Sequence, residues 1–251
     1  MMSDRSNSKR YMFGTALASV AMGGIPGLLQ HAVGQQVTNA NFGFEISGTS
    51  TVGSTGSGSK GALAPDAGTG TAFGVHTSTA TVYSFPTGNG SAHAFSSNSF
   101  SPGDYYQFNV PTIGIQNIVV SFDQTGSSTG PSHFSLIAID GSGSGTYTVS
   151  SYTVALATFS SSTTSSVPGV HMVYSLSSIS ALNNNSSVAF QLMDDDTVAL
   201  NGGAVGTAGT DRVDNFMVFG DAVSQVPEPA SLGLAAMGVS GLLLRRKPRC
   251  K

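Results

Sequence analysis

The sequence predicts an all-β fold, a two-sheet antiparallel sandwich of the jelly-roll type, with a signal segment at each end of the chain. Apolar and polar residues alternate with period two in many short segments, whereas helical periodicity is scarce. Clusters of Gly, Pro, Asn and Asp separate these segments and indicate frequent turns. The two ends of the chain differ from the rest because each combines an apolar stretch with basic residues. We therefore predict a signal peptide over residues 1–34, a sandwich domain over 35–225 and a separate apolar and basic C-terminal segment over 226–251.

The N-terminal segment has the three parts of a secretory signal peptide. A positively charged start precedes an uncharged, mostly apolar stretch over residues 11–29. Ala32-Val33-Gly34 then forms a small-x-small cleavage site. We expect cleavage after Gly34, which would leave Gln35 as the mature N-terminus. The alternative, an uncleaved membrane helix, is disfavoured by Pro26 and its neighbouring glycines.

Strand signals recur along the body of the chain. In the strongest of them, apolar residues are placed to share one face: Tyr106, Phe108 and Val110; Ile118, Val120 and Phe122; Val188, Phe190 and Leu192; and Val213, Met217 and Phe219. Residues 134–140 are apolar on both faces and predict a buried central strand. Weaker strands are expected within residues 71–85, 147–156 and 171–176.

Two segments predict something other than a regular strand. Residues 177–182 indicate one short helical turn, for which Ser177 or Ser178 could supply the cap. Residues 48–70 are rich in Gly, Ser and Thr and predict either a flexible loop or an edge strand.

The C-terminal segment joins three features in a fixed order. Pro227, Glu228 and Pro229 come first, an apolar stretch over residues 230–244 follows, and a basic cluster ends the chain. As a helix, the apolar stretch would be roughly 22 Å long, against about 30 Å for the hydrocarbon core of a bilayer. The stretch is therefore marginal as a permanent membrane anchor, and a helix there is expected to span the membrane only with local thinning.

This order of features resembles the PEP-CTERM sorting signal of Gram-negative bacteria. The resemblance rests on Pro227-Glu228-Pro229, on the apolar stretch and on the basic residues that begin with Arg245, Arg246 and Lys247. It implies that exosortase, a membrane protease-transpeptidase, recognises and processes the tail. It also implies export through the inner membrane, transient tethering, and a final place at the cell surface or outside the cell. An ordinary tail anchor that is never cut is the alternative.

The charge of the body excludes one class of partner. Between the two signals the chain carries only two basic residues, Lys60 and Arg212, against eleven acidic ones, for a net charge of −9. Such a surface repels phosphate backbones, so we expect no nucleic-acid binding. The single cysteine, Cys250, lies in the tail, and the body therefore contains neither a disulfide nor a thiolate metal site.

Catalytic motifs are not found in the sequence. The histidines of the body are widely spaced and form no HxH or HExxH pattern, and no G-x-S-x-G motif occurs. Glycoside hydrolysis requires paired carboxylates, and the body offers one glutamate and ten aspartates with no diagnostic spacing. We therefore predict a protein that is not an enzyme, with a hydrolase as the less favoured alternative.

Adjacent carboxylates suggest one metal site. Asp194, Asp195 and Asp196 repel one another, and a Ca²⁺ ion, which prefers oxygen ligands, would relieve that repulsion. A solvated loop after the preceding strand is the alternative. Asp214 and Asn215 lie on the last predicted strand, where they would need hydrogen-bond partners if they point inward, and a structural role is favoured for them.

One tyrosine is the best candidate for a ligand contact. Sugar rings stack on aromatic side chains, and the chain has no tryptophan. Tyr105 is placed opposite the predicted core face of its strand and could serve as such a platform, with ordinary packing as the alternative.

Short motifs in the body resemble a set of exported bacterial jelly-roll domains that often accompany PEP-CTERM tails. The matching segments are residues 42–45, 101–106, 127–131 and 212–216. In architecture these domains are similar to carbohydrate-binding modules. The resemblance to the PEP-CTERM family implies a link to exopolysaccharide or biofilm, because proteins with that signal are associated with both. We therefore expect a non-catalytic protein of the cell surface or extracellular matrix. The alternative is a carbohydrate-binding module, with or without Ca²⁺ as its cofactor and polysaccharide as its partner.

Overall fold

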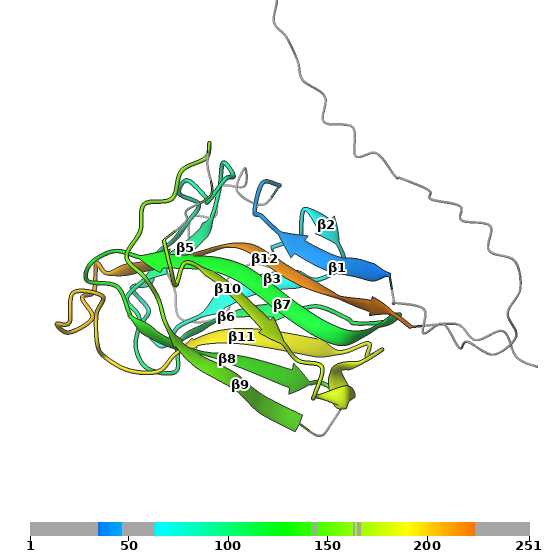
Figure 1. Ribbon diagram of the computed structural model, residues 1–251. Coiled ribbons are helices and arrows are strands. Elements are labelled where there is room, and N and C mark those ends of the chain that lie inside the picture. Colours follow the sequence, from blue (N-terminus) through cyan, green and yellow to red (C-terminus); the bar gives the residue numbers. More distant parts are fainter. Residues whose placement is uncertain (1–34, 47–62, 143–144, 163, 165–166, 224–251) are drawn as a thin grey trace, which may run out of the picture. The chain divides into compact units, whose positions relative to one another are not determined.

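A computed structural model describes the sandwich domain of the chain (Figure 1). The described residues are 35–46, 63–142, 145–162, 164 and 167–223. The chain divides into two compact units, Met1–Val33 and Gly34–Lys251, and every described residue belongs to the second. The predicted signal peptide, the sorting signal and its apolar helix lie outside the described residues.

Two antiparallel sheets form the domain, which confirms the predicted all-β sandwich (Figure 1). The first sheet has the strand order β10–β7–β12–β1–β2, and β5 pairs with both β12 and β4. Its strands are β1 (Gln36–Phe42), β2 (Ala67–Gly68), β4 (Tyr83–Ser84), β5 (Phe95–Asn98), β7 (Ile115–Gly126), β10 (His171–Ser175) and β12 (Thr210–Ala222). The second sheet has the order β3–β6–β11–β8–β9. Its strands are β3 (Thr71–Val75), β6 (Tyr105–Asn109), β8 (His133–Asp140), β9 (Gly145–Thr153) and β11 (Val188–Asp194).

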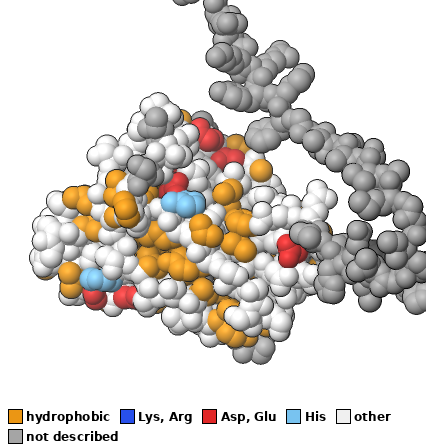
Figure 2. Space-filling model, viewed as in Figure 1, with side chains coloured by type: hydrophobic (Ala, Val, Ile, Leu, Met, Phe, Trp, Pro, Cys, Tyr) orange, Lys and Arg blue, Asp and Glu red, His pale blue; other side chains and the backbone are white. Residues whose placement is uncertain are grey.

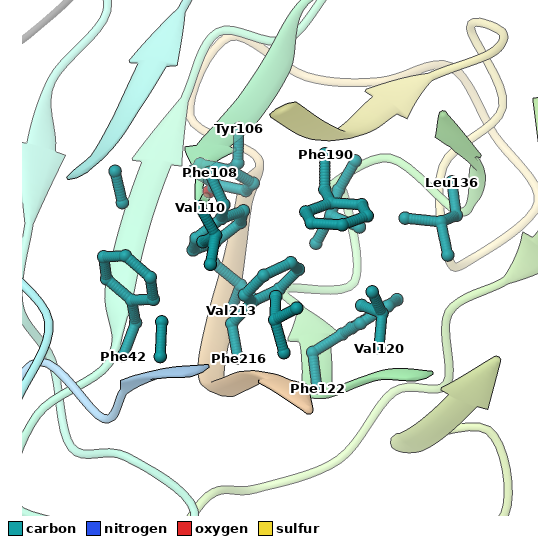
Figure 3. Packing of buried hydrophobic residues seen from close by; sticks show 14 of the residues in the cluster. Phe42, Tyr106, Phe108, Val110, Val120, Phe122, Leu136, Phe190, Val213 and Phe216 are labelled. Carbon is teal, nitrogen blue, oxygen red and sulfur yellow. The ribbon is translucent and has the colours of Figure 1, made fainter. Parts of the chain in front are cut away.

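Aromatic side chains from both sheets fill the core (Figure 3). Phe216 of β12 stacks on Phe108 of β6 with ring centroids 3.6 Å apart and planes at 3°. Phe42, Phe122 and Phe190 surround this pair at centroid distances of 6.3, 6.0 and 6.2 Å from Phe216. Each such ring buries a large apolar area, so this cluster holds the two sheets together.

Most of the predicted inward faces are confirmed, with β12 as the exception. The inward residues predicted for β6, β7 and β11 are all buried. On β12, Phe216 and Val218 are buried, whereas Met217 and Phe219 are half-exposed. The prediction that Met217 and Phe219 face the core together with Val213 is therefore wrong. The cause is a β-bulge, a register shift between Asp214 and Met217 that reverses the inward and outward positions.

Other segments match their predictions in part. The buried strand expected over residues 134–140 is β8, which lies between β11 and β9, next to the edge of its sheet. The predicted helical turn is the 3₁₀ helix η2 (Ser180–Leu182), and no side chain caps it. Of the segment 48–70, residues 63–70 are described and contribute the short strand β2, and the rest lies outside the described residues.

No helix among the described residues is long and apolar enough to cross a membrane.

Candidate functional site

A depression of about 550 Å³ lies on the outer face of the first sheet, at the bulge of β12. Strands β7, β10 and β12 and two loops line it, through Asn89, Gly90, Asp123, Thr164, His171, Asn215 and Met217. We call it the Asn215 pocket. Another depression, of about 370 Å³, is lined by Asn109, Pro111 and neighbouring residues and contains no titratable side chain.

Asn215 is the centre of the pocket's hydrogen-bond network. Its backbone has a positive φ of 50°, a left-handed conformation that asparagine tolerates better than most residues. Its side-chain Nδ2 donates to Asp123 Oδ2 at 2.9 Å, to Asp214 Oδ2 at 3.3 Å and to the carbonyl oxygen of Asn89 at 2.8 Å. One amide group therefore bridges two carboxylates and the loop that covers them.

Asp214 is fully buried beneath the pocket. Its Oδ2 accepts hydrogen bonds from the Asn89 N–H and the Ser91 hydroxyl, both at 2.6 Å, and its Oδ1 accepts from the Asn215 N–H at 2.8 Å. Burial nevertheless raises the pKa of Asp214 to about 6, because desolvation outweighs these hydrogen bonds. The side chain therefore exchanges its proton near neutral pH.

Asp123 and His171 are in direct contact at the side of the pocket. Asp123 Oδ1 lies 2.6 Å from His171 Nδ1, and its Oδ2 accepts from Asn89 Nδ2 at 3.0 Å. The Asp123 side chain is 5% exposed, whereas the His171 side chain is 55% exposed. The carboxylate therefore orients the imidazole, whose opposite edge is free to meet a ligand.

The chemistry of the pocket suits a ligand that carries hydroxyl groups. An amide, a carboxylate, an imidazole and the hydroxyl of Thr164 are grouped beside the apolar side chain of Met217. A small number of fixed polar groups with an apolar neighbour is typical of small-molecule sites. None of the described hydroxyl groups is hydrogen-bonded to His171 Nε2.

A second histidine pair also lacks the arrangement of a catalytic triad. His133 Nδ1 lies 3.0 Å from Asp196 Oδ2 and 3.0 Å from Ser132 Oγ. A triad places the serine and the acid on opposite ring nitrogens. Here both share one nitrogen, so no proton relay can run from the hydroxyl through the ring to the acid.

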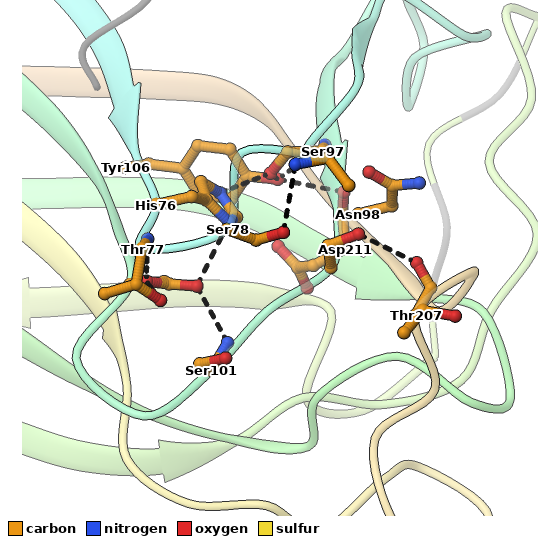
Figure 4. A network of polar contacts seen from close by, with 12 residues as sticks. His76, Thr77, Ser78, Ser97, Asn98, Ser101, Tyr106, Thr207 and Asp211 are labelled. Atoms are coloured by element: carbon orange, nitrogen blue, oxygen red, sulfur yellow. Dashed lines mark hydrogen bonds and ion pairs between the residues drawn. The ribbon is translucent and has the colours of Figure 1, made fainter. Parts of the chain in front are cut away.

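A third histidine does have groups on both nitrogens, but it is enclosed by the core. His76 Nε2 lies 3.0 Å from Ser97 Oγ, and its Nδ1 lies 3.2 Å from Asp104 Oδ2. Ser97 is 1% and His76 3% exposed, and Ser97 Oγ donates to the Tyr106 hydroxyl at 2.8 Å (Figure 4). The Tyr106 hydroxyl in turn donates to the Asp211 carbonyl at 2.9 Å. This network joins β5, β6 and β12 and leaves the serine no access to a substrate.

The three consecutive aspartates do not share one site. Asp194 points into the core on the same face as Phe190 and Leu192 and is 1% exposed. Asp195 accepts a hydrogen bond from Ser135 Oγ at 2.8 Å, and Asp196 pairs with His133. Within the described part of the chain, no group of three His, Cys, Asp or Glu residues could hold a metal ion. Calcium binding at this run therefore stays a prediction and would need ligands other than the three carboxylates.

Burial changes the acidity of two aspartates that point inward. It raises the pKa of Asp194 to about 7, and the nearby N–H of Asp196 offsets only part of that rise. The pKa of Asp211 is raised well above its usual range, again by burial, although Gln124 Nε2 donates to its Oδ1 at 3.0 Å. In both cases burial shifts the carboxyl group toward its neutral, protonated form.

Tyr105 lies far from the Asn215 pocket in the architecture. It is half-buried on the outer face of the second sheet, opposite Val75 and Met193 in the strand register. Its role as a ligand platform stays a prediction. Sequence analysis singled out Asp214 and Asn215 but missed Asp123, His171 and Asn89, because these residues come from separate segments with no shared motif.

Comparison with known sequences identifies the tail. A PEP-CTERM protein-sorting motif matches residues 225–247, a span that includes Pro227, Glu228 and Pro229 and the basic residues Arg245, Arg246 and Lys247. No curated protein matches the chain.

Comparison with solved structures finds β-domains at low identity. The K3 adhesin domain of Lys-gingipain from Porphyromonas gingivalis w83 is 13% identical with a TM-score of 0.33, over 54% of this chain and 77% of that one. The K2 adhesin domain of Lys-gingipain is 14% identical with a TM-score of 0.34, over 55% and 82%. A mutant of the carbohydrate-binding module CBM29-2 is 10% identical with a TM-score of 0.28, over 81% and 97%. The likeness to these proteins is one of fold class and extends no further.

The chain thus carries a PEP-CTERM sorting signal behind an all-β sandwich. Such a signal indicates export and sorting to the cell envelope or surface, with exosortase as the processing partner.

Proposed function

We propose that this chain is a non-catalytic protein of the cell surface or extracellular matrix that holds exopolysaccharide through the Asn215 pocket. The observation that carries the proposal is the network of Asn215, Asp123 and Asp214 around an exposed histidine. The sorting signal supports the proposed location, because it indicates export to the cell envelope or surface.

The polar groups of the pocket are already held in place by hydrogen bonds within the protein. The bulge and the left-handed backbone fix Asn215, and Asn89 and Asn215 hold the Asp123 carboxylate from two directions. A sugar hydroxyl both donates and accepts hydrogen bonds, so it fits a carboxylate and an imidazole placed side by side. Because the groups are already ordered, binding costs little conformational entropy.

The charge of the domain favours a neutral polymer. Arg212 is the only Lys or Arg among the described residues, and its guanidinium carbon lies 6.0 Å from the centre of the Phe159 ring. The face seen in Figure 2 shows acidic and histidine side chains and no Lys or Arg. An anionic polysaccharide would meet repulsion from this surface, whereas a neutral one would not.

The geometry of three histidines supports the non-catalytic part of the proposal. No described hydroxyl is hydrogen-bonded to His171 Nε2, His133 has both partners on one nitrogen, and the Ser97 hydroxyl next to His76 is buried. None of these three arrangements therefore matches the serine–histidine–acid geometry of acyl transfer.

A glycan array, read with and without chelator, tests the proposal, and release of reducing ends is measured on the same polymers. We expect binding to neutral polysaccharides and no release of reducing ends. Loss of the signal with chelator would establish the calcium-dependent form of the proposal. The absence of binding in both conditions would contradict the binding role, and release of reducing ends would contradict the non-catalytic role.

A further inference from the structure

Two buried aspartates have carboxyl oxygens without a hydrogen-bond partner. Asp194 is 1% exposed, and neither of its two carboxyl oxygens has a partner among the described residues. Asp211 is fully buried, and its Oδ2 also has no partner, although Gln124 Nε2 donates to its Oδ1 at 3.0 Å. A buried polar atom that lacks a hydrogen bond costs free energy and is rare in native proteins. Three such oxygens in two side chains therefore point to a ligand that compensates them.

The two carboxyl groups lie at one end of the sandwich, one on each sheet. Asp194 is the last residue of β11 in the second sheet, and Asp211 is the second residue of β12 in the first sheet. Both side chains point inward. Burial raises the pKa of Asp211, and the negative charge of Asp194 raises it further, so the two groups interact through the interior. A ligand bound by both would connect the two sheets.

The loop over residues 195–209 connects these two aspartates and covers this end of the domain (Figure 1). It is held in place by the backbone, since the N–H of Leu200 donates to the carbonyl oxygen of Gly130 at 3.0 Å. A Cβ added at Gly126 would lie 2.9 Å from Leu200 Cδ1 and 3.7 Å from Asp211 Oδ2. The apolar side chain of Leu200 and the unpartnered carboxyl oxygen therefore lie against the same glycine, and the loop shields this carboxyl group from solvent.

No basic side chain of the described residues forms an ion pair with either carboxyl group. The ion pairs among those residues include neither Asp194 nor Asp211. Burial raises the pKa of Asp211 although Gln124 and Arg212 lower it in part. Burial likewise raises the pKa of Asp194 although the N–H of Asp196 lowers it in part. A cation from solution would supply the charge that the described side chains do not.

We propose that Asp194 and Asp211 bind one Ca²⁺ ion beneath the loop over residues 195–209. The two carboxylates balance the charge of the ion, so the buried complex is neutral. Calcium takes about six to eight oxygen ligands in flexible geometry, and backbone carbonyl groups and water would complete the set. Mg²⁺ is less suited to the site, because it demands near-ideal octahedral geometry and retains several water molecules.

This site differs from the Asn215 pocket, which lies on the outer face of the first sheet, and from a site formed by three consecutive aspartates. Asp195 and Asp196 contact Ser135 and His133 instead. Without calcium, protonation lowers the cost of burying the two carboxyl groups, so we expect the domain to fold in both conditions. The bound ion would fasten the end of β11 to the start of β12 and hold the loop between them.

Calorimetric titration of calcium into the purified exported protein, after treatment with chelator, measures the affinity and the number of ions bound. Asp194→Asn and Asp211→Asn each remove one ligand charge and keep the shape of the side chain. Asp195→Asn is the matched control, because it makes the same change in a neighbouring, exposed residue. Thermal unfolding in chelator establishes whether each variant is folded, and its repetition in calcium measures the stabilisation.

We expect calcium to raise the unfolding temperature of the unmodified protein and of Asp195→Asn alike. Asp194→Asn and Asp211→Asn should each weaken the affinity at least about tenfold, and Asp195→Asn should leave it within about twofold. Amide hydrogen exchange of the unmodified protein adds the location without any variant, since calcium should slow exchange in the loop over residues 195–209. Absence of calcium binding, equal losses in the three variants, or unchanged exchange in this loop would each overturn the proposal.

Discussion

At the scale of single residues, Asn215 decides how the last strand presents its side chains. Sequence analysis recognised that Asp214 and Asn215 would need hydrogen-bond partners, and the structure supplies them from Asn89, Ser91 and Asp123. The bulge itself could not be predicted, because a single left-handed residue leaves no trace in the alternation of apolar and polar residues.

Substitutions of Asn215 distinguish the contribution of its bridging amide from that of its left-handed backbone. Asn215→Gly should lose the bridging amide but keep the left-handed backbone, whereas Asn215→Ala should lose both and be the less stable variant. We expect the alanine variant to lower the free energy of unfolding by about 2–4 kcal/mol, since it also leaves two buried carboxylates with fewer donors. Denaturant unfolding measures this, with Asn117→Ala as control, because Asn117 has a φ of 53° but is exposed. Equal losses in Asn215→Ala and Asn117→Ala would contradict a special role for the amide.

The inward aspartates make the stability of the domain depend on pH in an unusual direction. The pKa values of Asp194 and Asp214 are raised to about 7 and about 6 in the folded state, and that of Asp211 is raised further. Between pH 4 and pH 7 the folded state therefore binds more protons than the unfolded state, and stability falls as pH rises. The pKa of Asp104 is lowered by His76 and by backbone N–H groups despite its burial. Its titration therefore changes the stability of the domain only at more acidic pH.

We expect the free energy of unfolding to be at least about 2 kcal/mol higher at pH 5 than at pH 8. Asp194→Asn removes one titrating group without changing the shape of the side chain, so this variant should show a smaller difference. Denaturant unfolding across this pH range provides the measurement. A domain that grows more stable from pH 5 to pH 8 would show that these carboxyl groups are ionised and stabilised in the fold.

At the scale of elements, β12 connects the parts of the sandwich. It pairs with β7, β1 and β5, and its Phe216 contacts rings from both sheets. Period-two alternation located the inward faces of β6, β7 and β11 correctly. In the predicted part of each of these strands, every second residue stays on the same face of the sheet. The same rule failed on β12 for Met217 and Phe219, which follow the bulge.

Two alanine substitutions on β12 test this assignment of faces. Phe216→Ala should destabilise the domain by about 3–5 kcal/mol, because it removes a buried ring from the centre of the core. Phe219→Ala should cost less than about 1.5 kcal/mol, because its ring is half-exposed on the outer face. Thermal or denaturant unfolding compares the two variants, and similar losses would contradict the reversal of faces at the bulge.

At the scale of the whole molecule, composition and terminal signals were the most informative parts of the sequence. The sorting signal could be recognised because its three features are contiguous, and the fold class because turns and alternation recur along the body. The pocket could not be predicted because its groups come from β7, β10, β12 and two loops, which only the sheet topology brings together. We propose that the chain is an exported, acidic sandwich that holds a neutral polymer at one face.

The most direct measurement of this account is affinity electrophoresis of the exported protein through gels that contain the extracellular polysaccharide of the producing cells. His171→Ala removes an exposed group of the Asn215 pocket, and His133→Ala removes the histidine of the other surface pair as a matched control. We predict that the polysaccharide retards the unmodified protein and His133→Ala equally. His171→Ala should lose at least about tenfold in affinity, because it removes one hydrogen-bonding group from the pocket. Equal retardation of all three proteins, or of none, would contradict binding at this pocket.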